Sequence, residues 1–153
     1  ITFNENLPEE GITALFDRRL ISQAVTNIVK NATEAVMAVV GDTRGVGQID
    51  INVREVDGII TIDISDNGKG FPKEHRQRLL EPYMTTREGG TGLGLAIVGK
   101  ILEDHGGGIE LLDHPGVSAG GPGACVRMWF PKTGNGDVAA VNGRDDIKQR
   151  AIG

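Results

Sequence analysis

The sequence is poor in three features, and each absence excludes a class of protein. It contains a single cysteine, Cys125, so no internal disulfide can form, and this fits a reducing compartment. No apolar run approaches the ~20 residues that cross a bilayer, and we expect no secretory signal peptide. The formal net charge is −5 without a long basic run, which argues against nucleic acid as a partner. We therefore expect a cytoplasmic domain that is itself outside the membrane.

The length of 153 residues suits one domain with a hydrophobic core. We expect this domain to occupy residues 1–132, because the hydrophobic periodicity disappears after Pro131. Residues 133–153 are small, polar and charged, so we expect a disordered tail there. The chain begins at Ile1, and we expect it to be a fragment of a longer protein that can carry membrane segments elsewhere.

Glycine, by contrast, is abundant: 23 of the 153 residues are glycine, about twice the usual ~7%. Asp66-Asn-Gly68-Lys-Gly70 closes one strand-like run, and Gly90-Thr91-Gly92-Leu93-Gly94-Leu95 leads into an apolar helical stretch. Glycine lets another group approach the backbone closely. The N–H groups at a helix N-terminus are free to bind phosphate. The two clusters together predict a nucleotide site.

Hydrophobic periodicity and turn residues predict the order β-α-β-β-α-α-β-β. The strands are expected at residues 1–7, 48–56, 59–65, 109–113 and 124–130, and the helices at 17–40, 72–80 and 91–105. Asp17 is a candidate N-cap, and Asp57-Gly58 is a strong hairpin signal. This order predicts an α/β fold, a two-layer sandwich with a mixed sheet of about five strands and about three helices on one face. Residues 81–90 are polar and irregular, so we expect them to be mobile.

One face of the first helix carries a polar stripe, which consists of Gln23, Asn27, Lys30, Asn31 and Glu34. A solvated surface is the ordinary explanation for such a stripe. Two asparagines four residues apart favour a binding role instead, because asparagine is a poor helix former. The carboxamide oxygen of asparagine is a neutral ligand of the kind that Mg²⁺ accepts.

Asp66 follows a strand in which Ile60, Ile62 and Ile64 share one face. Asp66 has the same parity, so its carboxylate is directed toward the helix-covered side. A buried carboxylate requires hydrogen-bond donors, and the exocyclic amine of adenine is one, whereas guanine offers an acceptor there. The alternative is an Asx turn, in which the Asp-Asn-Gly sequence is plain loop chemistry.

Two nucleotide motifs that the sequence superficially contains are rejected. The stretch from Gly94 to Lys100 has the glycine and lysine spacing of a P-loop, but Ile101 follows where a Mg²⁺-binding hydroxyl is required. The dinucleotide pattern lacks its third glycine. The three histidines have no metal-ligand spacing, and Cys125 is expected in the core.

Four motifs in order resemble the ATP-binding catalytic domain of sensor histidine kinases, within the gyrase, Hsp90, histidine kinase and MutL superfamily. Residues 27–35 resemble the N box, 66–71 the G1 box, 81–86 the F box and 90–95 the G2 box. Residues 82–98 most resemble the nitrogen-regulation sensor kinases of the NtrY type. The resemblance covers residues 17 to about 131 and implies the Bergerat fold, with residues 72–90 as a mobile ATP lid.

The resemblance also implies roles for individual residues. Asn31 would bind Mg²⁺, and Asn27 and Lys30 would be catalytic residues that face the phosphates. Asp66 would read the adenine amine. The other implied ATP-binding residues are Gly68, Gly70, Tyr83, Thr85, Thr86, Gly90, Thr91, Gly92, Leu93, Gly94 and Leu95. Two departures are a tyrosine at 83, where phenylalanine is usual, and Ala124-Cys125, where a threonine is common.

Three functions are compatible with this superfamily. The first is a kinase that passes the γ-phosphoryl group of Mg·ATP to a histidine on the protein's own upstream dimerisation domain, with a response regulator as the next partner. Such a domain would be the cytosolic part of a membrane-anchored sensor. The second is a clamp-type ATPase, and the third is an anti-sigma serine kinase. Both alternatives generally carry an acidic residue at the position of Asn27, so this asparagine favours the histidine kinase.

Overall fold

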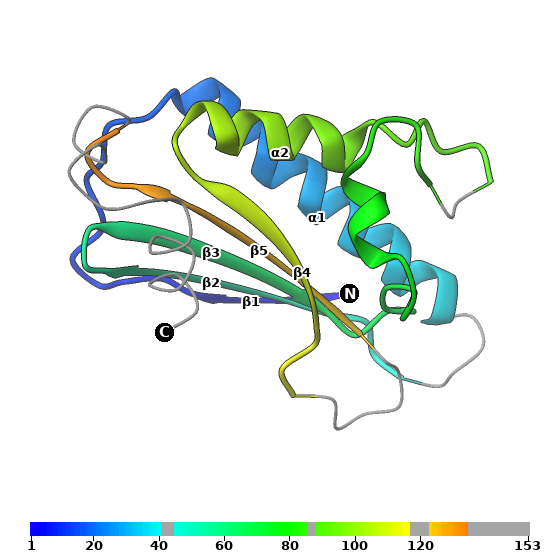
Figure 1. Cartoon of the computed structure of the whole chain (residues 1–153). Coiled ribbons are helices and arrows are strands. Elements are labelled where there is room, and N and C mark those ends of the chain that lie inside the picture. Colours follow the sequence, from blue (N-terminus) through cyan, green and yellow to red (C-terminus); the bar gives the residue numbers. More distant parts are fainter. Residues whose placement is uncertain (41–44, 86–87, 117–122, 135–153) are drawn as a thin grey trace.

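The computed structural model describes residues 1–40, 45–85, 88–116 and 123–134 of the chain. It has two layers, with the helices on one face of a five-stranded sheet (Figure 1). The elements follow in the order β1 (Thr2–Asn6), α1 (Arg18–Val40), β2 (Gln48–Val56), β3 (Ile59–Asp66), the 3-10 turn η1 (Arg76–Leu80), α2 (Gly94–Asp104), β4 (Gly108–Asp113) and β5 (Ala124–Pro131). None of the helices in these ranges is long and apolar enough to cross a membrane.

The sheet is mixed, with the strand order β1-β2-β3-β5-β4. β1 pairs with β2 in parallel, and every other pairing is antiparallel. Asp57 and Gly58 both have positive φ, 52° and 76°, and this geometry suits the tight hairpin that they form between β2 and β3. The prediction of a two-layer fold with a mixed five-stranded sheet is therefore confirmed.

The helices pack on the sheet through the apolar positions that the periodicity indicates. The side chain of Asp17 caps α1, since its Oδ1 accepts the N–H of Leu20 at 3.0 Å. The buried residues of α1 recur every three or four positions and meet alternate isoleucines of β3. They are Ile21, Ala24, Ile28, Ala32 and Val36 on the helix, and Ile60, Ile62 and Ile64 on the strand.

The number of helices is lower than expected. Residues 72–80 form a 3-10 turn only from Arg76 to Leu80, because His75 has a left-handed backbone with φ of 57°. α2 begins at Gly94 rather than near residue 91, because Gly92 has φ of 69°, which an α-helix cannot continue. Thr91, Gly92 and Leu93 therefore remain as a loop in front of the helix.

The sheet face opposite the helices is also largely buried on β3. Asp63 on this face binds Arg54 at 2.8 Å and Arg127 at 2.8 Å. Burial raises the pKa of the Asp63 carboxyl, but the hydrogen bonds from Arg127 and Arg54 outweigh this, and the pKa is lowered overall. The strand alternation does not indicate these ion pairs, since their partners lie on three different strands.

Gly68 follows β3 and lies directly against the backbone of α1. A Cβ atom at Gly68 would lie 2.5 Å from the carbonyl carbon of Ala35. The same atom at Gly99 in α2 would meet only the Cγ2 of Ile109, at an ordinary 3.7 Å. Glycine at 68 is thus required for the turn and the helix to touch, whereas glycine at 99 is not.

Two alanine substitutions test this difference. Gly68→Ala should lower the free energy of unfolding by roughly 1–3 kcal/mol, because backbone atoms must move apart. Gly99→Ala should raise it by about 0.5–1 kcal/mol, because alanine is the better helix former. Urea unfolding of both variants and the wild type measures these changes. A Gly68→Ala variant as stable as the wild type would contradict the close packing.

Candidate nucleotide site

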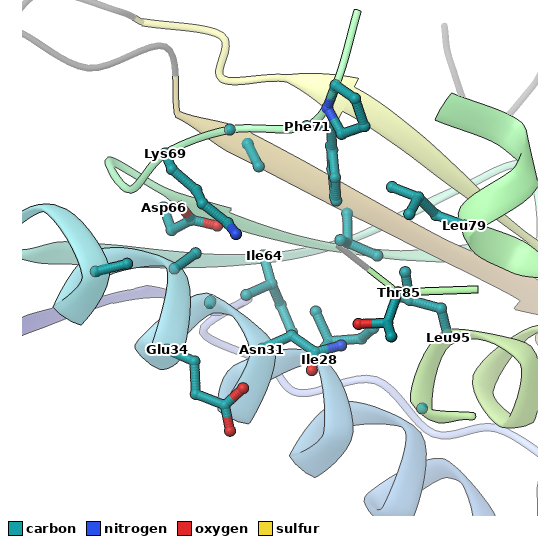
Figure 2. A pocket seen from close by; sticks show the side chains of 18 of the residues that line it. Ile28, Asn31, Glu34, Ile64, Asp66, Lys69, Phe71, Leu79, Thr85 and Leu95 are labelled. Atoms are coloured by element: carbon teal, nitrogen blue, oxygen red, sulfur yellow. The ribbon is translucent and has the colours of Figure 1, made fainter. Parts of the chain in front are cut away.

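Two adjoining recesses lie between α1, the end of β3 and the loop before α2. The inner recess is largely apolar, and Ile28, Ile64, Phe71, Leu79 and Leu95 are among the residues that form its walls (Figure 2). The outer recess is lined by polar residues of α1 and by the loop from Glu88 to Leu93. Asn31, Glu34 and Gly94 line both recesses, so the two are continuous along α1.

Asp66 provides the buried carboxylate of the inner recess. It is the last residue of β3 and only 4% exposed, in agreement with its predicted parity. Its Oδ1 accepts the backbone N–H of Gly68 at 2.9 Å. Among the described residues, this backbone N–H is the one hydrogen-bond donor that reaches the carboxylate. A largely buried carboxylate with a single donor is costly unless a ligand supplies another.

The environment of Asp66 disfavours its charge. Burial raises the pKa of its carboxyl from 3.8 to about 6, and the hydrogen bond from Gly68 and the positive charge of His114 oppose this only in part. The carboxylate form therefore exists near neutral pH but is poorly stabilised in the free protein. A donor that enters the recess would stabilise this form.

The turn after Asp66 is anchored on both sides. The side chain of Asn67 accepts the N–H of Gln48 at 2.8 Å and donates to the carbonyl of Val46 at 2.9 Å, which ties the turn to the start of β2. The N–H of Lys69 donates to the carbonyl of Ala35 in α1 at 3.4 Å. These three hydrogen bonds fix the residues that follow Asp66. The residue pattern assigned no role to Asn67, although the glycines that flank it signal a constrained turn.

The polar stripe of α1 lines the outer recess, and its members Gln23 and Lys30 are also exposed to solvent. Gln23, Asn27, Lys30, Asn31 and Glu34 all line it. Opposite them is the N-terminus of α2, where the first N–H groups of the helix have no intrahelical partner. The hydroxyl of Thr91 accepts one N–H of this loop, that of Leu93, at 3.4 Å. Helix-end N–H groups, an ammonium and carboxamides are a set of groups that suits a phosphate chain.

A cation in this site would be bound by few protein ligands. Among the described residues, no three His, Cys, Asp or Glu side chains gather to hold a metal. Asn31 lies where the two recesses meet and can offer its carboxamide oxygen. Mg²⁺ commonly takes one or two protein oxygens and completes its shell with phosphates and water, so these residues fit that ion.

Most residues that the motifs single out line one of the recesses. The inner recess contains Asp66, Gly70, Thr85, Gly92 and Leu95, and the outer one contains Asn27, Lys30, Gly90, Thr91 and Leu93. Asn31 and Gly94 line both. Gly68 lines neither and packs behind the site against α1. Thr86 lies outside the described residues.

Tyr83 occupies an unusual position. Its side chain is 77% exposed and lines neither recess, while its backbone has φ of 66°. Its N–H donates to the carbonyl of Gly92 at 2.9 Å, and a Cβ at Gly92 would lie 2.5 Å from the carbonyl carbon of Tyr83. The backbone of Tyr83 therefore contacts the loop that precedes α2.

Several wall residues were not identified as site residues from the motifs. Lys69, Leu79 and Val126 line the inner recess, and Glu34 lines both recesses. Lys69 lies within the first glycine cluster, which could have revealed it. Leu79 and Val126 come from distant parts of the sequence, and only the fold brings them to the site. Phe71, the last residue of the G1 box, is half-buried in the wall of the inner recess.

Comparison with known proteins gives consistent results. The family described as "Histidine kinase-, DNA gyrase B-, and HSP90-like ATPase" matches residues 16–134. The chain is 55% identical over 134 residues to the nitrogen regulation protein NtrY of Azorhizobium caulinodans, covering 88% of the chain and 17% of that protein. It is 38% identical over 110 residues to the C4-dicarboxylate transport sensor protein DctB of Rhizobium meliloti, covering 72% of the chain and 17% of that protein. The chain thus spans about a sixth of the length of these relatives.

A solved structure agrees with these relatives. The nucleotide-free catalytic domain of the histidine kinase ThkA is 31% identical and superposes with a TM-score of 0.71, covering 86% of this chain and 80% of that one. The resemblance that the four motifs indicate, including the NtrY type, is confirmed by these findings.

The raised pKa of Asp66 predicts how the stability of the free protein depends on pH. Between the unfolded pKa near 3.8 and the folded pKa of about 6, the native state binds more protons than the unfolded state. Stability should therefore fall as the pH rises through this window. Relative to Asp66→Asn, the wild type should lose roughly 1–3 kcal/mol of unfolding free energy across it.

Urea unfolding at several pH values measures this difference. Asp63 titrates in the opposite sense but is present in both proteins, so its contribution cancels. If the unfolding free energies of the wild type and Asp66→Asn changed in parallel with pH, Asp66 would not carry the buried charge.

Proposed function

The chain belongs to the histidine kinase-, DNA gyrase B- and HSP90-like ATPase family, and from this premise we propose that it binds Mg·ATP and donates the γ-phosphoryl group to a histidine on a separate dimerisation domain. One observation carries the proposal. An apolar recess that contains a buried carboxylate opens directly into a recess lined by amides, an ammonium and a helix N-terminus. These two environments match the two ends of a nucleotide.

Adenine suits the inner recess. Its flat ring would pack between apolar walls from α1, β3 and the turn that contains Phe71. Its exocyclic amine would donate to the Asp66 carboxylate, which has one hydrogen-bond donor, the N–H of Gly68, among the described residues. Guanine presents a carbonyl oxygen at that position and would be repelled by the carboxylate. The polarity of Asp66 therefore favours adenine over guanine.

The outer recess would hold the phosphates. Lys30 and the N–H groups at the start of α2 would neutralise their charge, and Asn27 would lie beside them. Asn31 is the residue that would bind Mg²⁺, which neutralises charge that develops on the transferring phosphoryl group. Phosphoryl transfer depends mainly on positioning and electrostatics, so this set of residues is sufficient without a strong base.

Asn27 favours a kinase over a self-contained ATPase. A carboxamide cannot take a proton from water, whereas the clamp-type ATPases and anti-sigma kinases generally have an acidic residue at this position. The outer recess does contain Glu34, but this residue lies about two helical turns beyond Asn27 and lines both recesses. A site that activates water poorly suits a kinase, because water competes with the histidine for the phosphoryl group.

The relatives indicate the wider setting. The printed names include a nitrogen regulation protein and a transport sensor protein. We propose that the chain is the cytosolic catalytic part of a membrane-anchored two-component sensor in nitrogen-related signalling. Its partners would be its own upstream phosphoacceptor domain and a downstream response regulator. Nucleic acid is not among the expected partners, given the net charge of −5.

Asn31→Ala should separate metal-dependent from metal-independent binding. Affinity for ATP in the presence of Mg²⁺ should fall by about tenfold or more, because a polar contact to a charged group is lost. Affinity for ATP with a chelator present should change much less. Calorimetric titration under both conditions provides the comparison. An equal loss in both would rule out Asn31 as the metal ligand.

The phosphoryl acceptor can be tested with radiolabelled ATP. The chain alone should hydrolyse ATP close to background, because general-base assistance worth ~10²–10⁴-fold is absent. When the upstream domain of the longer protein is added, label should appear on it as an acid-labile, base-stable phosphohistidine. Rapid hydrolysis by the chain alone, without labelling of that domain, would favour the clamp-type ATPase.

A further inference from the structure

Arg76 connects the turn that begins at Phe71 to β4, which is distant in sequence. Its Nη2 donates to Oδ1 of Asp113 at 2.6 Å, and its Nη1 donates to the carbonyl of Leu111 at 3.4 Å. Its Nε reaches back to the carbonyl of Pro72 at 3.5 Å. The guanidinium also lies 5.8 Å from the centre of the Phe71 ring, within the range of a cation–π contact. Only 20% of the side chain is exposed.

These contacts surround one wall of the inner recess. Phe71, Pro72 and Leu79 all line that recess, and they precede or belong to η1. Leu111 and Asp113 belong to β4, the edge strand of the sheet beside η1 (Figure 1). Arg76 itself lines neither recess. Its side chain therefore holds the wall from behind and fixes it to the sheet.

The wall also packs on the core through Phe71, Leu79 and Leu80, which are only partly buried. η1 is a single 3-10 turn with no buried residue, and it starts after His75 in a left-handed conformation. Such a turn has little stability of its own, since 3-10 hydrogen bonds are weak and short runs depend on outside contacts. The charge-assisted bond to Asp113 is the shortest polar contact that the structure gives to this turn.

We propose that Arg76 is a positioning residue for the nucleotide, which acts through Phe71 and η1 and is held by Asp113. This inference rests on the proposed function and extends it to a residue outside the four motif boxes. Because Arg76 acts behind the base end of the site, its loss should weaken binding of the base and leave the phosphate end intact. The effect on affinity should therefore be the same with and without Mg²⁺.

Variants of the chain test this role against a matched control. Arg76→Ala should raise the Kd for ADP by about three- to thirtyfold, the range between an exposed ion pair and a buried charged hydrogen bond. Asp113→Asn should give part of that loss, and Arg76→Lys, which keeps the charge, should restore part of the affinity. Arg78→Ala is the control, since the Arg78 side chain lies in the same turn, is 57% exposed and, among the described residues, forms one ion pair, with Glu81 at 4.0 Å.

The titrations are made at a temperature where urea unfolding shows every variant to be folded. A merely stabilising role would lower the free energy of unfolding without changing the Kd of the folded protein. Equal Kd values for Arg76→Ala and Arg78→Ala would overturn the inference, and so would a loss that appears only with Mg²⁺. Failure of the wild type to bind ADP would instead refute the proposed function.

Hydrogen exchange provides a second test of the inference, and this test needs no nucleotide. Amides of residues 70–80 should exchange faster in Arg76→Ala than in Arg78→Ala, while those of α1 and β3 should not differ. Equal exchange of residues 70–80 in the two variants would overturn the inference whatever the nucleotide titrations show.

Discussion

The burial of the Asp66 carboxylate is the constraint on which the rest of the site depends. A charge that is only 4% exposed at the end of an isoleucine-rich strand would ordinarily be selected against. Here it is held in place by the pairing of β3 on both sides and by one hydrogen bond from Gly68. The free protein thus keeps an acceptor whose pKa is raised to about 6, and a bound donor would relieve this cost. Such local conflicts between stability and polarity are typical of functional sites.

α1 unites the two ends of the site. Its apolar face packs on β3, its C-terminal half supports the turn after Asp66, and its polar stripe lines the outer recess. Gly68 and Ala35 meet without room for a side chain, so the distance between the carboxylate and the stripe is set by backbone contact. Asn31 then lies at the junction of the recesses. Because one helix contributes a wall to each recess, it can place a base and a phosphate chain relative to each other with little reorganisation.

The strand alternation and the helix periodicity were enough to predict the layers, the hairpin at Asp57-Gly58 and the inward direction of Asp66. Each of these features depends on a pattern of neighbouring residues, because burial of one face of a strand or helix sets the spacing of its apolar side chains. The motifs likewise predicted most residues that line the recesses. The length of the helix expected at residues 72–80 was overestimated, because a single turn with a left-handed His75 leaves no signal in the periodicity.

Contacts between distant segments were beyond the reach of the sequence. The ion pairs of Asp63 with Arg54 and Arg127 require three strands in register, and the contact of Arg76 with Asp113 joins a turn to an edge strand. The orientation of Tyr83 depends on a positive φ that tyrosine seldom adopts, so its exposure could not be predicted.

The most direct test of the account is the number of protons released when ADP binds, measured by calorimetry in buffers of different ionisation enthalpy. At about pH 5.5 free Asp66 is largely protonated, and a donor from the base should drive the proton off. The wild type should then release more protons than Asp66→Asn, in which the phosphates titrate identically, and the difference should vanish near about pH 8. Equal release by both proteins at the lower pH would show that the nucleotide does not bind to the Asp66 carboxylate.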